Sequence, residues 1–62
     1  MKDQAIREIR AQHQRTLDVY RERYEQLVAE GKHDLAATVK GQISRQCGRL
    51  DAIDEVLEVL NG

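Results

Sequence analysis

The segment Glu30-Gly31-Lys32-His33-Asp34 decides the fold, because it interrupts a 62-residue chain that otherwise favours helix throughout. Gly31 is expected to follow the C-terminus of a first helix, since glycine adopts the left-handed conformation there without a Cβ penalty. Asp34 is the expected N-cap of a second helix, because its carboxylate can accept free amides of the first turn. So short a connection predicts two antiparallel helices.

The first helix has a single apolar stripe. Its members recur at spacings of three and four residues, which is typical of one helix face and not of a strand. His13 lies on this stripe and is expected to be half-buried, and Asp3 is the expected N-cap. The residues of the stripe expected to face the second helix are Ile6, Ile9, Leu17, Tyr20, Tyr24 and Leu27.

The second helix repeats the pattern on the other side of the turn. Its expected seam residues are Val39, Ile43, Leu50 and Leu57, with further apolar positions at Leu35, Cys47, Ile53, Val56 and Leu60. The fold class is therefore all-α: an antiparallel, coiled-coil-like hairpin spanning residues 1–62 as one domain. We expect the first helix over about 3–30, the turn at 31–34 and the second helix over about 34–60, each helix about 40 Å long.

Composition excludes several classes of protein. One cysteine cannot form a disulfide framework, and the absence of proline agrees with long helices. No apolar run approaches the ~18 residues of a membrane span, and no apolar run follows the first residues as in a signal peptide. We expect a non-membrane, cytoplasmic protein.

Charge predicts the register of the hairpin. Ten basic and seven acidic residues precede residue 50, whereas four acidic residues and no basic ones follow it. If the turn centres near residue 32, the numbers of facing residues sum to roughly 64. Arg7 then faces Glu58, and Arg10 faces Asp54 and Glu55. The expected contacts nearer the turn join Asp18 and Glu22 to the region of Arg45 and Lys40.

A line of small residues marks one side of the second helix. Two helices alone bury too little apolar surface to offset the ordering of 62 residues, so we expect another surface to cover part of them. Glycine inside an exposed helix costs up to about 1 kcal/mol, which favours a role for this line in close helix packing over two tolerated glycines facing solvent. The expected interface residues are Ala37, Gly41, Ser44, Gly48 and Ala52.

No pattern indicates catalysis, a cofactor or a metal. His13 and His33 lie at opposite ends of the first helix, and Cys47 has no adjacent histidine, so it is expected to fill the core. A carboxylate cluster for a divalent ion is the alternative use of the acidic end of the chain. We favour an acidic strip that faces the basic half; its residues are Asp51, Asp54, Glu55 and Glu58.

The arginines of the first helix suggest an alternative function. A nucleic-acid-binding regulator would use Arg7, Arg10 and Arg15, with Tyr20 and Tyr24 available for stacking. The interleaved acidic residues and the net charge of -1 disfavour that partner. The tyrosines fit the seam better.

The second helix resembles small helical-hairpin proteins encoded among the head and portal genes of tailed bacteriophages. The similarity covers Leu35 to Leu60 and rests on Val39-x-Gly41-x-Ile43 and a leucine-rich acidic end. A common tract of that family continues with Gly-Leu where this chain has Arg45-Gln46. The resemblance implies a virion or assembly component without catalytic residues.

Two other hairpin families share less. The plasmid copy-number RNA-binding repressor is similar in architecture alone, as a four-helix bundle of two hairpins. The sporulation-control aspartyl-phosphate phosphatases carry Ser-Gln-Glu-Leu-Asp, and only Leu50-Asp51 of that motif stands here.

These observations favour a non-enzymatic structural or assembly protein. We expect it to pack helices against copies of itself, against a larger assembly such as a phage portal or head, or both. The alternatives are the nucleic-acid-binding regulator and an inhibitor that masks a host protein.

Overall fold

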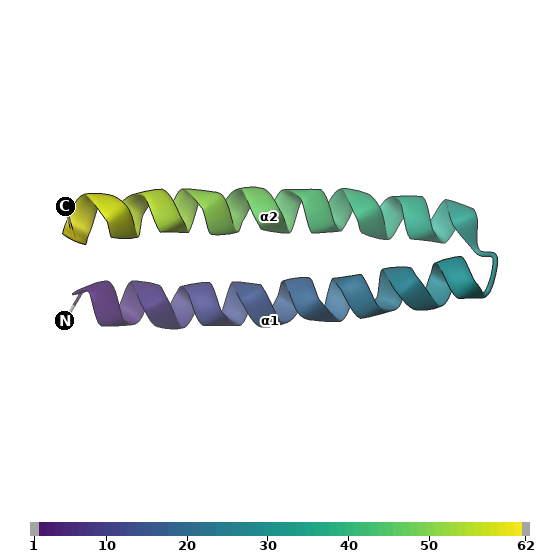
Figure 1. Cartoon of the computed structure of the whole chain (residues 1–62), viewed down its shortest axis with the longest axis horizontal. Helices are drawn as coiled ribbons and strands as arrows, with labels where there is room; N and C mark the ends of the chain where they lie inside the picture. Colours follow the sequence, from purple (N-terminus) through teal and green to yellow (C-terminus); the bar gives the residue numbers. More distant parts are fainter. Residues whose placement is uncertain (1, 62) are drawn as a thin grey trace.

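The protein is an antiparallel hairpin of two long helices, as the sequence predicts. The computed structural model describes residues 2–61, with side chains from residue 3 onward; α1 spans Lys2–Ala29 and α2 spans His33–Asn61. The helices lie side by side, with the turn at one end and both termini at the other (Figure 1). The Cα trace measures 45 × 15 × 11 Å. Over the described residues, neither helix is long and apolar enough to cross a membrane.

The turn is held by a paired hydrogen-bond motif at the end of α1. Gly31 has a φ of 75°, and its amide donates to the carbonyl of Val28 at 3.0 Å. The amide of Lys32 donates to the carbonyl of Leu27 at 2.9 Å. These two bonds form a Schellman motif, which satisfies carbonyls that the end of a helix leaves free. The left-handed conformation explains why glycine stands at position 31.

The two expected N-caps lie inside the helices instead. The carbonyl of Lys32 accepts from the amide of Ala36 at 3.0 Å, so α2 begins before Asp34. Asp3 also lies within α1, and its carboxylate accepts from the next amide, that of Gln4, at 2.9 Å. Both carboxylates lie in a first helical turn, where they interact favourably with the helix dipole. The glycine motif positions the turn without an aspartate cap.

The core between the helices is thin. Four apolar side chains are buried, and no side chain among the described residues is less than 2% exposed. The Cα radius of gyration is 14.4 Å, against about 10.6 Å for a compact domain of this length. One layer of contact therefore stabilises the whole rod. Its buried apolar residues are Leu17, Ala36, Val39 and Leu50.

Most of the expected seam lies between the helices, with clear departures at its edges. Ile6, Tyr20, Tyr24, Leu27, Ile43 and Leu57 are half-buried. Ile9 was expected in the seam, but it is 47% exposed. A stripe in α1 and a stripe in α2 meet only along their centre lines, so residues on the margins remain open to solvent. The other exposed members of the apolar stripes are Val28, Leu35, Val56 and Leu60.

One of the expected ion pairs between the helices forms. The Nε of Arg10 lies 2.6 Å from Oδ1 of Asp54, in agreement with facing numbers that sum to 64. Among the side chains of residues 3–61, the other ion pair joins Lys32 and Glu30 at the turn. The expected pairing of Arg7 with Glu58, and of Asp18 and Glu22 with Arg45 and Lys40, is absent from this part of the chain. Exposed charges so placed gain little from a fixed geometry.

Candidate interaction surface

The small-residue line occupies the face of α2 that points away from α1. Gly41 lies two residues from each of the seam residues Val39 and Ile43, and Gly48 lies two residues from the buried Gln46 and Leu50. Two residues correspond to about 200° of rotation in an α-helix, so the glycines lie opposite the seam. We call the exposed residues Ala37, Gly41, Ser44, Gly48 and Ala52 the small-residue face.

Space above the two helical glycines is open. A Cβ atom placed on Gly41 or on Gly48 would meet no atom within 4 Å. Packing against α1 therefore does not require either glycine, and this removes α1 as the partner of the small-residue face. Within the hairpin, the two glycines only weaken the helix.

An exposed apolar patch continues the small-residue face towards the chain ends. A shallow groove crosses from α1 to α2 beside Ile9 and Val56, and a second depression lies along the last turns of α2. Val59 is 80% exposed, and Val56 and Leu60 are about half exposed. We call these residues the free-end patch; they are Ile6, Ile9, Ala52, Ile53, Val56, Val59 and Leu60.

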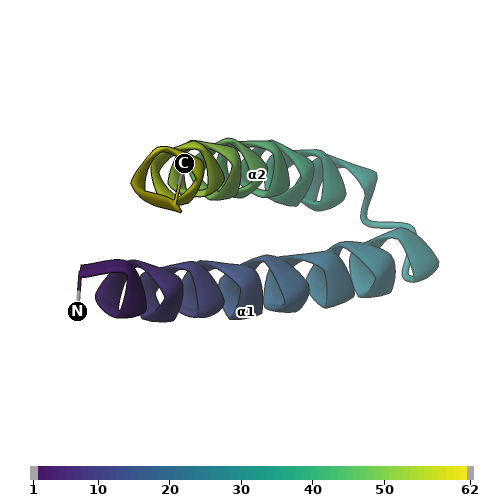
Figure 2. The same cartoon turned by 60° about the vertical axis from the view of Figure 1, so that its left-hand side comes forward.

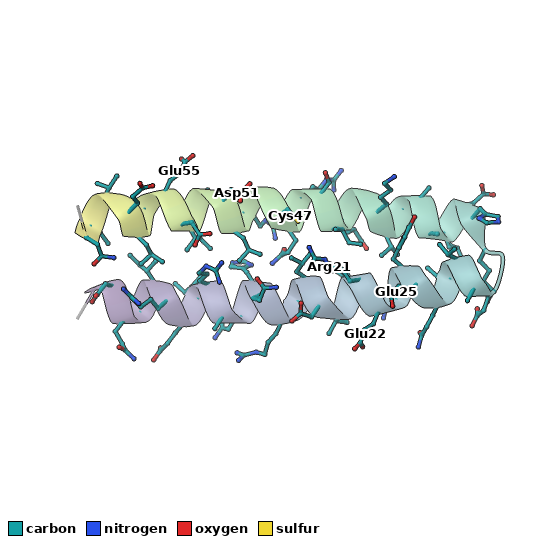
Figure 3. The ribbon with its side chains drawn as sticks, viewed as in Figure 1. Arg21, Glu22, Glu25, Cys47, Asp51 and Glu55 are labelled. Carbon is teal, nitrogen blue, oxygen red and sulfur yellow. The ribbon has the colours of Figure 1, made fainter. Side chains whose placement is uncertain are left out.

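The outer face of α1 has the opposite character. Its residues are exposed and mostly charged. Glu22 points away from α2 into solvent, whereas Glu55 points away from α1, on the side of α2 that carries the small-residue face (Figure 3). The residues along the outer face of α1 include Gln4, Glu8, Ala11, Arg15, Asp18 and Glu22.

A buried glutamine joins the two helices at mid-length. Gln46 is 3% exposed, and its Nε2 donates to the backbone carbonyl of His13 at 3.0 Å. The same Nε2 lies 2.7 Å from Nδ1 of His13. A carbonyl can only accept, so the amide nitrogen of Gln46 must face it, and the second N–H of that amide is then directed at Nδ1 of His13. The structure confirms a half-buried His13.

Sequence reasoning missed Gln46. Its only signal is its position, because Gln46 falls between Ile43 and Leu50 with the spacing of the α2 seam. Periodicity marks apolar residues as core, and it gives a glutamine no weight. Among the described side chains, no buried nitrogen or oxygen lacks a hydrogen-bond partner. A satisfied polar pair of this kind fixes the relative position of two helices.

The Arg10–Asp54 pair determines what the α1 arginines can do. Its hydrogen bond, supported by charge attraction, lowers the pKa of the Asp54 carboxyl from its ordinary value, and it raises that of Arg10. Arg10 is therefore engaged by a carboxylate. Arg7 and Arg15 are eight residues apart in sequence, which places them about 80° apart around α1 and about 12 Å apart along it. Among the described side chains, Arg10 is paired with Asp54, whereas Arg7 and Arg15 form no ion pair.

The described residues offer little to a metal or a nucleophilic reaction. No group of three or more His, Cys, Asp or Glu residues in this part of the chain could hold a metal ion. Cys47 is half-buried on α2, on the side that faces α1 (Figure 3). In the acidic strip, Asp54 pairs with Arg10, while Asp51, Glu55 and Glu58 are exposed.

The comparisons with known proteins identify no relative. The sequence matches no protein-family model, and neither a curated protein nor a solved structure is significantly similar to it.

Proposed function

We propose that this chain is a non-enzymatic assembly protein that acts by packing α2 against α2 of a second copy. The observation that carries the proposal is the outer face of α2, where the small-residue face runs into the free-end patch. Within residues 2–61 no further element covers either helix, as the turned view also illustrates (Figure 2). A helix that is apolar or small on both sides is typical of one with partners on both sides.

Exposed area is consistent with one further interface. The chain exposes 4883 Å², whereas a compact protein of 7.1 kDa exposes roughly 4,100 Å². The excess of about 800 Å² equals the area that one partner buries in a standard protein interface. A second hairpin could cover such a surface, and two hairpins would form a four-helix bundle.

Charge favours a second copy in the antiparallel orientation. Apart from Asp34 in its first turn, the carboxylates of α2 all follow its cations: Lys40, Arg45 and Arg49 come first, and Asp51, Asp54, Glu55 and Glu58 come after them. In an antiparallel pair, the basic half of one α2 lies beside the acidic half of the other, whereas a parallel pair places like charges together. Small residues at the crossing permit the helix axes to approach to about 8 Å.

The resemblance to hairpin proteins of bacteriophage head and portal genes suggests the setting. In that setting the paired hairpins would be a component of a virion or of its assembly. Portal and terminase genes beside the gene for this chain would support this part of the proposal. Neighbouring genes of plasmid replication would instead support the regulator.

Solution mass as a function of concentration tests the pairing directly. Wild-type protein is expected to change from monomer to dimer in analytical ultracentrifugation, with helicity already present in the monomer. Gly41→Leu with Gly48→Leu places two isobutyl groups on the crossing and is expected to leave monomers of unchanged helicity. Ala11→Leu is the matched control, because it adds one isobutyl group to the outer face of α1.

Three results would contradict the proposal. The first is a wild-type monomer at every concentration, and the second is a dimer that survives both glycine substitutions. The third is a stoichiometric complex with a foreign protein in place of self-association, which would favour the masking inhibitor.

A further inference from the structure

A polar groove lies between the helices near mid-length, away from the free-end patch. Its walls come from both helices, with Tyr20 on α1 and the remaining residues on α2. It is open to solvent and has a volume of about 170 Å³, which is room for several water molecules. We call it the basic groove; its lining residues are Tyr20, Gln42, Arg45, Gln46 and Arg49.

The groove is cationic although the chain as a whole is slightly acidic. Two guanidinium groups line it, and no carboxylate does. Arg45 and Arg49 are one helical turn apart, so their side chains are neighbours on α2. Among the described side chains, neither arginine forms an ion pair. Two adjacent like charges without a counter-ion disfavour the free state and favour an anion between them.

The polar groups of the groove are mainly donors that no other described residue uses. Tyr20, Gln42, Arg45 and Arg49 make no side-chain hydrogen bond to another residue between positions 3 and 61. Gln46 is different, because both protons of its amide are directed to His13. The bonds to His13 join α2 to α1 at Gln46, which is itself a lining residue of the groove.

We infer that the basic groove binds a phosphate group, carried by a nucleotide or by a single nucleic-acid strand. A phosphate offers several acceptor oxygens, and guanidinium groups match them with paired N–H donors. A carboxylate could occupy one such fork but would leave the second arginine unmatched. The half-buried ring of Tyr20 at the wall supplies an aromatic face for the base attached to the phosphate.

This inference does not require the proposed self-association, although Arg45 and Arg49 also belong to the basic half of α2 that the antiparallel pairing uses. The groove is formed within one hairpin and uses arginines other than Arg7, Arg10 and Arg15. Its test is therefore run on wild-type protein in whatever oligomeric state the mass measurements show. Gly41→Leu with Gly48→Leu leaves the lining of the groove unchanged, and a mass measurement on the Arg45/Arg49 variant shows whether its loss of phosphate binding is separate from a change in self-association.

Titrations with three probes test the site and identify its source of phosphate. The probes are inorganic phosphate, adenosine monophosphate and a fluorescein-labelled single-stranded RNA of ten nucleotides. Binding is measured by anisotropy for the RNA and by the Arg Nε resonances for all three. We expect the resonances of Arg45 and Arg49 to move, while those of Arg7 and Arg15 stay in place.

Two double variants provide the comparison. Arg45→Gln with Arg49→Gln is expected to weaken binding at least tenfold, whereas Arg7→Gln with Arg15→Gln, which removes the same charge from α1, is expected to change it less than twofold. If two phosphates are bound, log K for the RNA falls with log salt concentration at a slope of about −1.4. Helicity by circular dichroism establishes that each variant is folded.

Every outcome decides between alternatives. Binding of adenosine monophosphate as tight as that of the RNA assigns the groove to a free nucleotide, and much tighter binding of the RNA assigns it to a strand. Equal losses in both double variants would overturn the inference, since any basic residue would then serve. Unmoved Arg45 and Arg49 resonances with all three probes would also overturn it, even if the Arg45/Arg49 variant failed to fold.

Discussion

The outer faces of α1 and α2 belong to helices of nearly equal length that pack on each other, yet their chemistry is opposite. The outer face of α1 carries the charged residues Glu8, Arg15, Asp18 and Glu22, which are well suited to contact with water. The outer face of α2 carries two glycines, two alanines and a serine, then exposed valines. The seam explains neither set of residues. The proposed self-association accounts for the difference, because it would bury the outer face of α2 and leave that of α1 in water.

Charged residues placed on the outer face of α2 should have the largest effect, which is on self-association. Val56→Glu with Val59→Glu places two carboxylates on the free-end patch, beside Glu55, and we expect self-association to weaken at least 100-fold. Burying these charges at an interface would require desolvation without a partner. Analytical ultracentrifugation measures the change. Ala11→Glu with Ala29→Glu, on the outer face of α1, is expected to leave the dissociation constant within twofold.

Loss of the buried glutamine should have the second-largest effect, which is on the stability of the fold. Gln46→Ala removes the donor that both His13 atoms use, and we expect a loss of about 1–3 kcal/mol in the free energy of unfolding. Urea unfolding followed by circular dichroism measures it. Gln42→Ala, one turn earlier and exposed, is the control and should change stability by less than about 0.5 kcal/mol. Equal effects of the two substitutions would mean that the His13 contact contributes nothing.

Alanine in place of a helical glycine of α2 should have a smaller effect, which differs between the monomer and the dimer. Because the Cβ of Gly48→Ala meets open space in the hairpin, we expect the monomer to gain about 0.5–1 kcal/mol. The dimer should gain less or lose affinity, because the added methyl group keeps the helix axes apart. Thermal unfolding at two protein concentrations separates these effects. A stabilisation that does not depend on protein concentration would show that the small-residue face, like the outer face of α1, takes no part in self-association.

The smallest effect concerns pH at the free ends. The pKa of Asp54 is lowered by its hydrogen bond from Arg10, so the pair stabilises the fold above the ordinary carboxyl pKa of about 3.9, and this is lost as pH falls through the lowered value. Arg10→Gln should return the pKa of Asp54 towards its ordinary value. A carbon-13 NMR titration of the carboxyl detects this. An unchanged titration would show that the contact does not persist in solution.

The sequence predicted the helices better than the contacts between them. Spacing and Gly31 were enough for two antiparallel helices, because helical periodicity and a left-handed glycine are local properties of the chain. The rule that facing residue numbers sum to roughly 64 correctly predicted the pair of Arg10 and Asp54. It did not place Arg7 on Glu58, since exposed charges are free to remain solvated. The burial of residues at the edge of the seam, such as Ile9, depends on how wide the contact between the two helices is. The spacing of residues along one helix does not determine that width.

By itself, the sequence determined that this chain is a helical hairpin with a small-residue line along α2. Only the tertiary structure decided that this line lies opposite the seam, that Gln46 is the buried polar residue, and that Arg45 and Arg49 line one groove. The physical reason is that the residues of one helix set its stripes, whereas the relative rotation of two helices sets which stripe is covered. That rotation is a property of the pair of helices, and it leaves the outer face of α2 exposed.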